Sequence, residues 1–517
     1  MPPLLLHGVR LVPVGGARPT ADPARAARPS DAPVDVRLAD GRVTEVAPRL
    51  RARPDETVVD AEGRWAIPGL WDQHVHSGQW ASSFTRLDLG AATSAAEVVE
   101  RVRLAATDRG AAGAMLEGYG FRDALWPDLP TTAALDAVAP HVPVVLISGD
   151  VHCGWLNSAA LRQLGLPPTA DVVREHEWFD ALARLGQRSR PDDGYARAVA
   201  HAAARGVVGI VDMEFAPNHR QWPSRIAGGI DALRVRTGVY LDDLDDVLDA
   251  GLRTGDELAG GRGLLTMGPV KVITDGALNT RTAFCHEPYP MPRGEATAGR
   301  PDLADPGNGE LTVPLEELCA LMRRGHAGGL EMAVHAIGDA ANHVALDAFA
   351  ATGARGSIEH AQLLAPADVP RFASLEVAAS VQPAHLLDDR DVVEAYWPGR
   401  GGATFPLRAL LDAGAQLRFG SDAPVAPMDP WLAMAAAVHR TADDRAPWHP
   451  EQHITPAEAL AASTDGWGTV APGHPADIVL LDADPLAHTE PATAAAVLRT
   501  MAVHTTVAAG RITHQTP

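Results

Sequence analysis

Lysine is almost absent from this 517-residue chain, because 43 of its 44 basic residues are arginine and only Lys271 is lysine. Arginine can replace lysine on a solvated surface, but not where the chemistry requires a primary amine that can lose its proton. The absence of every other lysine therefore makes Lys271 a candidate functional residue. Composition alone leaves open that Lys271 is a surface residue that escaped replacement by chance.

Cysteine is scarce as well. The three cysteines are too few and too scattered for a disulfide framework, and none belongs to the Cys-x-x-Cys pair that is typical of zinc knuckles. We therefore expect a protein of a reducing compartment. The cysteines are Cys153, Cys285 and Cys319.

Positive charge and long hydrophobic runs are also limited. The 44 basic residues face 65 acidic ones, and the formal net charge of -21 argues against nucleic acid and anionic membranes as partners. The N-terminal MPPLLLHGVRLVP has only three consecutive leucines, which is too short for a signal peptide core or a membrane span. We expect a cytoplasmic protein.

The hydrophobic content of 46% is enough for a large core, and both ends of the chain have the alternating pattern of β-strands. Asp40-Gly41 in VDVRLADGRVTEVAP and Ala509-Gly510 in TTVAAGRITH predict hairpin turns. We expect residues 1–68 and 468–517 to form one composite β-sandwich, with an exposed loop rich in proline, alanine and arginine at residues 14–34.

Between these ends, short β-rich segments alternate with amphipathic stretches, which is typical of βα units. Eight such segments predict an α/β fold with a (β/α)₈ TIM barrel at residues 69–467. The first two segments are separated by about 130 residues, so we expect an inserted subdomain at about 77–205, after the first strand. The segments are WAIPGLWDQH, VVGIVDME, LRVRTGVY, GPVKVITDG, EMAVHAIGD, GSIEHAQ, EVAASVQP and AQLRFGSDA.

Five of the eight segments end in residue types that bind metals. Because the carboxyl ends of barrel strands meet on one face, these residues can share one pocket. His74 and His76 lie two apart, so both imidazoles would point to the same side of a strand and could bind one ion, for which zinc is suitable. Two histidines at this spacing also occur by chance in a chain with 21 histidines. The residues are His74, His76, Lys271, His335, His360 and Asp422.

Lys271 would repel a cation in such a pocket unless its chemistry changed. Burial beside positive charge lowers the pKa of a lysine, and the neutral amine can react with CO₂ to give a carbamate, an anionic ligand that can bridge two ions. Arginine cannot form this group. The alternative is a lysine that is paired with Asp275 or with another core carboxylate.

His335, His360 and Asp422 each have an ordinary structural interpretation. A single histidine that ends an apolar strand is more often a hydrogen-bonded core residue than a ligand, and Asp422 could cap a helix. Together, however, the two histidines supply two neutral donors for a second ion. Asp422 can bind one ion and accept a proton from water that the metal activates.

Nine segments, in order from about residue 35 to 512, give the chain a clear resemblance to the amidohydrolase superfamily. More narrowly, it is similar to amidohydrolase family 3, the group of YtcJ-like and N-substituted formamide deformylase-like proteins. The segments are PGLWDQHVH, GYGFRDALWP with DLPTTAALDAVAP, GDVHCGWLNSAAL, VKVITDGALNTRTA, VHAIGDAA, IEHAQ, SVQPAHLLDD, FGSDAPVAPMDPW and PGHPADIVLLDADP.

The resemblance implies a ligand set and a reaction. His74, His76 and Asp422 would hold one metal, His335 and His360 the other, and carbamylated Lys271 would bridge two ions, by default Zn²⁺, with manganese, iron or cobalt as alternatives. Hydroxide activated by the metals would cleave an amide-type C–N bond of a small N-acyl, N-formyl or cyclic amide, with Asp422 as the general base and acid. Decarboxylation, deamination or ester hydrolysis at the same site stays open, as does a regulatory protein that contains metal without catalysis.

Residues that contact the substrate are harder to predict, and each candidate is as readily a packing residue. No feature of the sequence predicts the oligomeric state, so a homo-oligomer is possible. The candidate substrate residues are His152, Trp155, Asp275, Arg281, Gln382 and His385.

Overall fold

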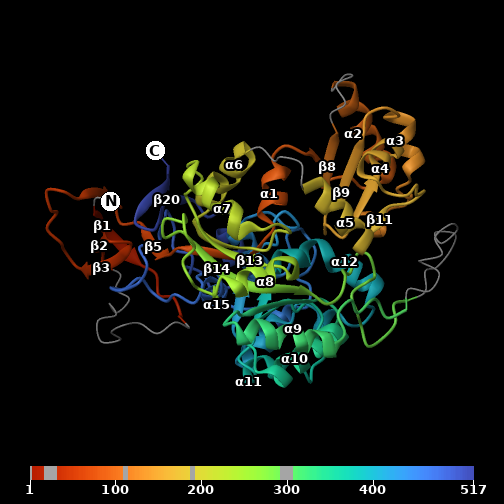
Figure 1. The fold of residues 1–517 in the computed structure, drawn as a ribbon. Helices are drawn as coiled ribbons and strands as arrows, with labels where there is room; N and C mark the ends of the chain where they lie inside the picture. Colours follow the sequence, from red (N-terminus) through yellow and green to blue (C-terminus); the bar gives the residue numbers. More distant parts are fainter. Residues whose placement is uncertain (1–2, 17–31, 109–114, 187–191, 291–306, 517) are drawn as a thin grey trace.

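The computed structural model describes residues 3–16, 32–108, 115–186, 192–290 and 307–516, and it contains three β-sheets. Part of the predicted loop, residues 17–31, lies outside the described residues. Figure 1 shows the sheet formed by the chain ends at the left, the barrel at the centre, and a separate unit at the upper right.

Strands from both ends of the chain share one eight-stranded sheet. Strand β1 connects the N-terminal strands of this sheet to the C-terminal ones. Its first residues pair with β2 and β4. After an irregularity between Leu6 and Val9, Arg10 and Leu11 pair with β5. The order is β21-β20-β19-β5-β1-β2-β3, with β4 also on β1. The strands are β1 (Leu4–Leu11), β2 (Val34–Ala39), β3 (Arg42–Ala47), β4 (Thr57–Asp60), β5 (Trp65–Pro68), β19 (Ile478–Leu481), β20 (Val503–Ala508) and β21 (Arg511–Gln515).

Both predicted hairpins are confirmed. Asp40 and Gly41 have φ of 51° and 72°, and Ala509 and Gly510 have φ of 51° and 78°. Positive φ at both central residues is the requirement of the two-residue turn that matches the twist of paired strands. The turns therefore set the registers of β2 with β3 and of β20 with β21.

The central sheet has eight parallel strands and forms a nearly closed barrel, which confirms the predicted fold class. An isolated parallel bridge between Val75 and Ala423 joins the first strand to the segment after the last. The first predicted segment divides in two, because residues 65–68 join the terminal sheet and only residues 70–75 enter the barrel. The strands, in order around the barrel, are β6 (Leu70–Val75), β12 (Val207–Asp212), β13 (Arg234–Val239), β14 (Leu265–Ile273), β15 (Met332–Ala336), β16 (Gly356–His360), β17 (Ala378–Val381) and β18 (Leu417–Phe419).

Helices between the strands cover the outside of the barrel, so that strands such as β12, β15 and β16 are buried along their whole length. In the part of the chain that the structure describes, no helix is both long and apolar enough to cross a bilayer. The helices are α7 (Asn218–Ala227), α8 (Leu241–Asp249), α9 (Leu315–Ala327), α10 (Asp339–Thr352), α11 (Val369–Ser374), α12 (Leu386–Tyr396), α13 (Leu407–Asp412), α14 (Pro430–His439), α15 (Pro456–Ala462) and α16 (Pro491–Arg499).

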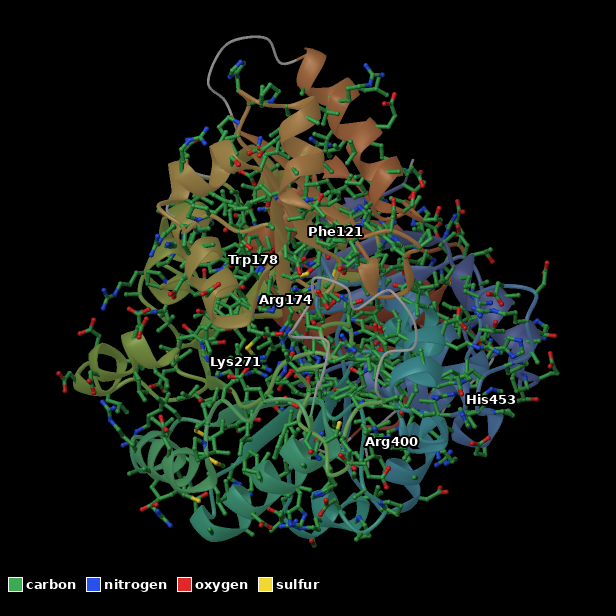
Figure 2. The ribbon with its side chains drawn as sticks, turned by 90° about the vertical axis from the view of Figure 1, so that its right-hand side faces the viewer. Phe121, Arg174, Trp178, Lys271, Arg400 and His453 are labelled. Atoms are coloured by element: carbon green, nitrogen blue, oxygen red, sulfur yellow. The ribbon has the colours of Figure 1, made fainter. Side chains whose placement is uncertain are left out.

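The long segment between β6 and β12 builds a unit with its own five-stranded sheet, in the order β11-β10-β9-β8-β7. Helices α1 and α6, which enter and leave this unit, pack on one another. Figure 2 shows Lys271 below this inserted unit, in which Phe121 and Trp178 are labelled. Its elements are α1 (Ser77–Ser83), β7 (Leu87–Asp88), α2 (Ala95–Asp108), β8 (Leu116–Phe121), α3 (Thr132–Val138), β9 (Val144–Ser148), β10 (Cys153–Leu156), α4 (Ser158–Leu164), β11 (Val173–Arg174), α5 (Glu175–Gly186) and α6 (Asp192–Ala203).

Candidate metal centre

One cavity, with a volume of ≈ 170 Å³, lies at the carboxyl ends of the barrel strands, beneath the inserted unit. All six side chains that the sequence predicts as metal ligands line it, although they come from five strands and from positions up to 348 residues apart, from 74 to 422. They lie at or just after the ends of β6, β14, β15, β16 and β18, where a barrel places functional side chains.

His74, His76 and Asp422 form the first donor group. Nε2 of His76 lies 3.3 Å from Oδ1 of Asp422, and Nε2 of His74 lies 3.6 Å from the same oxygen. The backbone N–H of Asp422 donates to the carbonyl oxygen of His74 at 2.7 Å, so the contact between the last and first strands sets the position of the carboxylate. The three donor atoms lie within 4.8 Å of one another.

This group fits a divalent cation. Oδ1 of Asp422 is buried and has no hydrogen-bond partner among the described residues, although a buried carboxylate oxygen that lacks a partner is costly. Two imidazole nitrogens face the same oxygen. A bound ion would satisfy all three donors, and nitrogen and carboxylate ligands together suit Zn²⁺ and neighbouring divalent metals.

The protonation of His74 and His360 is set by groups outside the centre. Nδ1 of His74 donates to Oε2 of Glu359 at 2.6 Å, and Nδ1 of His360 donates to Oε1 of Gln382 at 2.8 Å. Glu359 also accepts a hydrogen bond from the hydroxyl of Ser357. A proton on Nδ1 leaves the lone pair on Nε2 of each ring, as in metal-bound histidines of other proteins.

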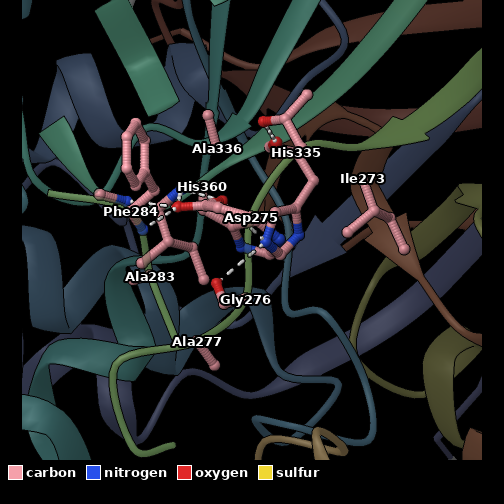
Figure 3. Close-up of polar contacts among 12 residues, drawn as sticks. Ile273, Asp275, Gly276, Ala277, Ala283, Phe284, His335, Ala336 and His360 are labelled. Atoms are coloured by element: carbon pink, nitrogen blue, oxygen red, sulfur yellow. Dashed lines mark hydrogen bonds and ion pairs between the residues drawn. The ribbon is translucent and has the colours of Figure 1, made fainter. Parts of the chain in front are cut away.

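His335 uses its other nitrogen in the same way. Its Nε2 lies 3.3 Å from the carbonyl oxygen of Gly276 and 3.4 Å from Oδ1 of Asp275 (Figure 3), which leaves the lone pair on Nδ1. The carboxylate of Asp275 also accepts backbone N–H groups of Phe284, Ile337 and Gly338. Asp275 and Gln382 therefore contact histidines of the centre and do not line the cavity.

Lys271 lies inside the barrel. It is neither a surface residue nor paired with Asp275, the two ordinary explanations for a single lysine. It is 2% exposed, so it is not a surface residue, and Asp275 is held by backbone amides instead. Nζ lies 3.1 Å from Nε2 of His74 and forms no ion pair with any carboxylate of the described residues. Burial lowers the pKa of Lys271 to about 8. A substantial fraction of the amine is therefore neutral near pH 8, as carbamate formation requires.

The electrostatics of the other donors also favour a cation. Burial holds the pKa values of His335 and His360 well below the usual range, so both rings are neutral at pH 7. Burial alone would raise the pKa of Asp422, but the imidazole groups of His74 and His76 beside it hold this pKa well below its usual range. Neutral imidazoles and an ionised carboxylate are the forms that bind metal.

The predicted substrate residues separate into two groups. His152 and His385 line the cavity. Arg281 lies over the ring of Tyr396, outside the cavity lining. Trp155 is fully buried in the hydrophobic core of the inserted unit, where Nε1 donates to the carbonyl oxygen of Thr131 at 2.8 Å. Packing within the fold occupies the side chains of Trp155 and Arg281, and neither of them lines the cavity.

His152 reaches the cavity from the loop between β9 and β10 of the inserted unit. Its Nδ1 lies 3.0 Å from Oε2 of Glu175, and Oε1 of Glu175 accepts hydrogen bonds from Thr280 and Thr282, which follow β14. Burial alone would lower the pKa of His152, but the charge of Glu175 raises it to about 9. The loop after β14 thus fixes a cationic side chain of the inserted unit at the cavity.

Several residues of the site are not among those predicted from the sequence. Glu359 is the most informative, because a carboxylate inside the buried strand GSIEH needs a partner, and that pattern could have been noticed. Arg122 and Asp388, which line the cavity and form an ion pair at 2.9 Å, carry no such signal, since charged residues in loops and at helix starts are common.

Glu359→Gln should weaken metal binding without removing a ligand. The amide can still contact Nδ1 of His74 but no longer supplies the negative charge that fixes the proton there, and loss of such outer partners typically costs about 10–100-fold in metal affinity. Titration of metal-stripped protein with Zn²⁺ against a competing chelator measures the change. Glu376→Gln, in an exposed ion pair with Arg355, is the matched control. Equal affinities of Glu359→Gln and the wild type would contradict this role for Glu359.

The chain is similar in sequence to proteins that are named as amidohydrolases or deformylases. The chain is 27% identical over 482 residues to the putative amidohydrolase YtcJ of Bacillus subtilis, which covers 84% of this chain and 87% of that protein. It is 25% identical over 491 residues to the N-substituted formamide deformylase of Arthrobacter pascens, with 86% and 88% covered.

The chain is also similar to solved structures of metal-dependent hydrolases. An uncharacterised metal-dependent hydrolase from Pyrococcus horikoshii superposes with a TM-score of 0.72 at 25% identity, covering 94% of this chain and 99% of that one. The amidohydrolase family model matches residues 57–514. This match covers most of the chain, and the chain therefore belongs to the amidohydrolase family.

Proposed function

We propose that this hydrolase cleaves an amide-type C–N bond of a small molecule in a centre that holds two divalent metal ions. One observation carries the proposal: a buried, unpartnered oxygen of Asp422 faces two imidazole nitrogens in a cavity lined by two further neutral histidines and a buried lysine. The likeness to a formamide deformylase supports an amide as the bond that is cleaved.

The residues would divide into two ligand sets. His74, His76 and Asp422 would hold one ion, His335 and His360 the other, and the carbamate of Lys271 would bridge them. Bound divalent ions would supply a lowered pKa for water and polarisation of a substrate carbonyl group. Zinc is the first choice for this mixture of nitrogen and oxygen donors, with manganese, iron or cobalt as alternatives.

Asp422 would move the proton. Its low pKa keeps the carboxylate ionised, so a carboxylate that holds an ion through Oδ1 could accept a proton from the attacking water on its other oxygen. It would then pass that proton to the leaving nitrogen, which must be protonated before the C–N bond breaks. The backbone hydrogen bond from Asp422 to His74 keeps the carboxylate in place during both transfers.

The rest of the cavity favours a small organic substrate. Phe121, Phe179 and Phe215 give it an apolar side, whereas Arg122 and Asp388 bring charge to its lining. Phe215 stacks on His76 with ring centroids 5.4 Å apart, so the apolar side adjoins the centre. An amide with an uncharged substituent matches this surface better than a highly charged one.

A substrate panel tests the reaction class. Metal-loaded protein should release amine from at least one N-formyl, N-acyl or cyclic amide faster than it hydrolyses matched esters, deaminates heterocycles or decarboxylates acids. Asp422→Asn protein, purified in the same way, controls for contaminating hydrolases. Preference for an ester, a deamination or a decarboxylation substrate would assign one of those reactions instead, and no turnover of any substrate would favour a regulatory role.

A further inference from the structure

His385 belongs to a second group of metal donors in the cavity. It ends a short 3₁₀ turn, Pro383–His385, directly after strand β17, and its ring is buried. One donor atom each from His360, His385 and Asp422 lie within 4.8 Å of one another. The rings of His360 and His385 are nearly parallel, with centroids 6.4 Å apart.

The surroundings of His385 resemble those of the other histidines in the centre. Its Nε2 lies 3.3 Å from the carbonyl oxygen of Ser421, which can only accept, so this contact holds a proton on Nε2 and leaves the lone pair on Nδ1. His74, His335 and His360 each have one nitrogen occupied by an outer acceptor in the same way. That arrangement is common among metal-bound histidines.

The backbone also holds His385 in place. The preceding Pro383 fixes the start of the turn, and the N–H of His385 donates to the carbonyl oxygen of Gln382 at 3.0 Å. Gln382 in turn accepts from Nδ1 of His360. One short segment thus positions His385 directly and His360 through the amide of Gln382.

We propose that His385 is a metal ligand, and that His360, His385 and Asp422 form a donor group for the second divalent cation. This group shares His360 with the set of His335, His360 and Lys271 and adds a ligand that follows strand β17. It would take ions that accept two imidazoles and a carboxylate, such as Zn²⁺ or Co²⁺. The inference rests on the metal centre of the proposed function.

Titration of metal-stripped protein with Zn²⁺ and Co²⁺ tests the proposal, with bound metal measured by mass spectrometry and the Co²⁺ visible spectrum recorded at each step. Wild type should bind two ions. His385→Gln should keep the first ion and weaken the second by more than the roughly 100-fold that loss of an outer hydrogen-bond partner can cost. His343→Gln, which removes a half-exposed histidine that contacts Asp368 outside the cavity, should bind both ions as the wild type does.

A second variant separates a ligand from a residue that only positions Ser421. His385→Gly should regain the second ion and its Co²⁺ spectrum when imidazole is added, because free imidazole can occupy the vacated space. The proposal would be overturned if His385→Gln bound both ions as the wild type does. It would also be overturned if a His385→Gly protein that melts like the wild type lost the second ion and imidazole did not restore it. If the wild type bound one ion, this proposal and the second ion of the proposed centre would both be wrong, but hydrolysis with a single metal would still stand. If the wild type bound no ion, metal-dependent hydrolysis itself would be contradicted.

Discussion

Asp422→Asn should lower kcat for amide hydrolysis by about 10²–10⁴-fold, the range that general acid–base catalysis contributes. The amide has nearly the same shape as the carboxylate, but it cannot accept a proton from water and carries no charge for a cation. The backbone N–H of residue 422 would still donate to His74, so the strands should stay closed. Steady-state kinetics on the best amide of the panel, with metal content measured in parallel, gives the result.

The control for this variant is Asp391→Asn, which removes an exposed carboxylate from an ion pair with Arg445 outside the cavity and should leave kcat unchanged. If Asp422→Asn retained more than about a tenth of the wild-type kcat with full metal content, Asp422 could not be the group that transfers the proton.

Lys271→Arg should remove most of the activity although it preserves a positive charge. Arginine cannot form a carbamate, and a guanidinium in this buried position would repel a second cation. We expect loss of the second ion and a fall in kcat/KM of about 10³-fold, equivalent to about 4 kcal/mol of transition-state stabilisation. Metal analysis and kinetics should therefore change together.

Two further measurements make the Lys271 prediction specific. Because the chain contains one lysine, protein supplied with ¹³C-labelled bicarbonate should show one lysine carbamate signal, and Lys271→Arg should lack it. Lys271→Ala should regain part of its activity with a short carboxylic acid, which can occupy the position of the carbamate. Full activity of Lys271→Arg would rule out the bridging role.

The sequence predicts the barrel well because its signals are local. Each barrel strand is a short apolar run between amphipathic helices, and His74, His335, His360 and Asp422 follow from their places at the ends of such runs. The hairpin turns at Asp40-Gly41 and Ala509-Gly510 are also local, since the residues themselves accept positive φ.

Contacts between distant strands could not be predicted in this way. That Glu359 accepts a hydrogen bond from His74 depends on how closely β16 approaches β6 across the barrel, which no single segment encodes. Trp155 could not be assigned from the sequence for a different reason. An aromatic residue near a predicted site has the same sequence pattern whether it lines a cavity or fills a core, and only the packed structure places Trp155 in the core.

Removal and restoration of metal tests the central claim most directly. Protein stripped with a chelator and dialysed should lose at least about 99% of its amide hydrolysis, because both the activation of water and the polarisation of the carbonyl depend on the ions. Adding back Zn²⁺ or Co²⁺ should restore the rate in step with occupancy, up to two ions per chain. Undiminished hydrolysis by fully stripped protein would contradict the account.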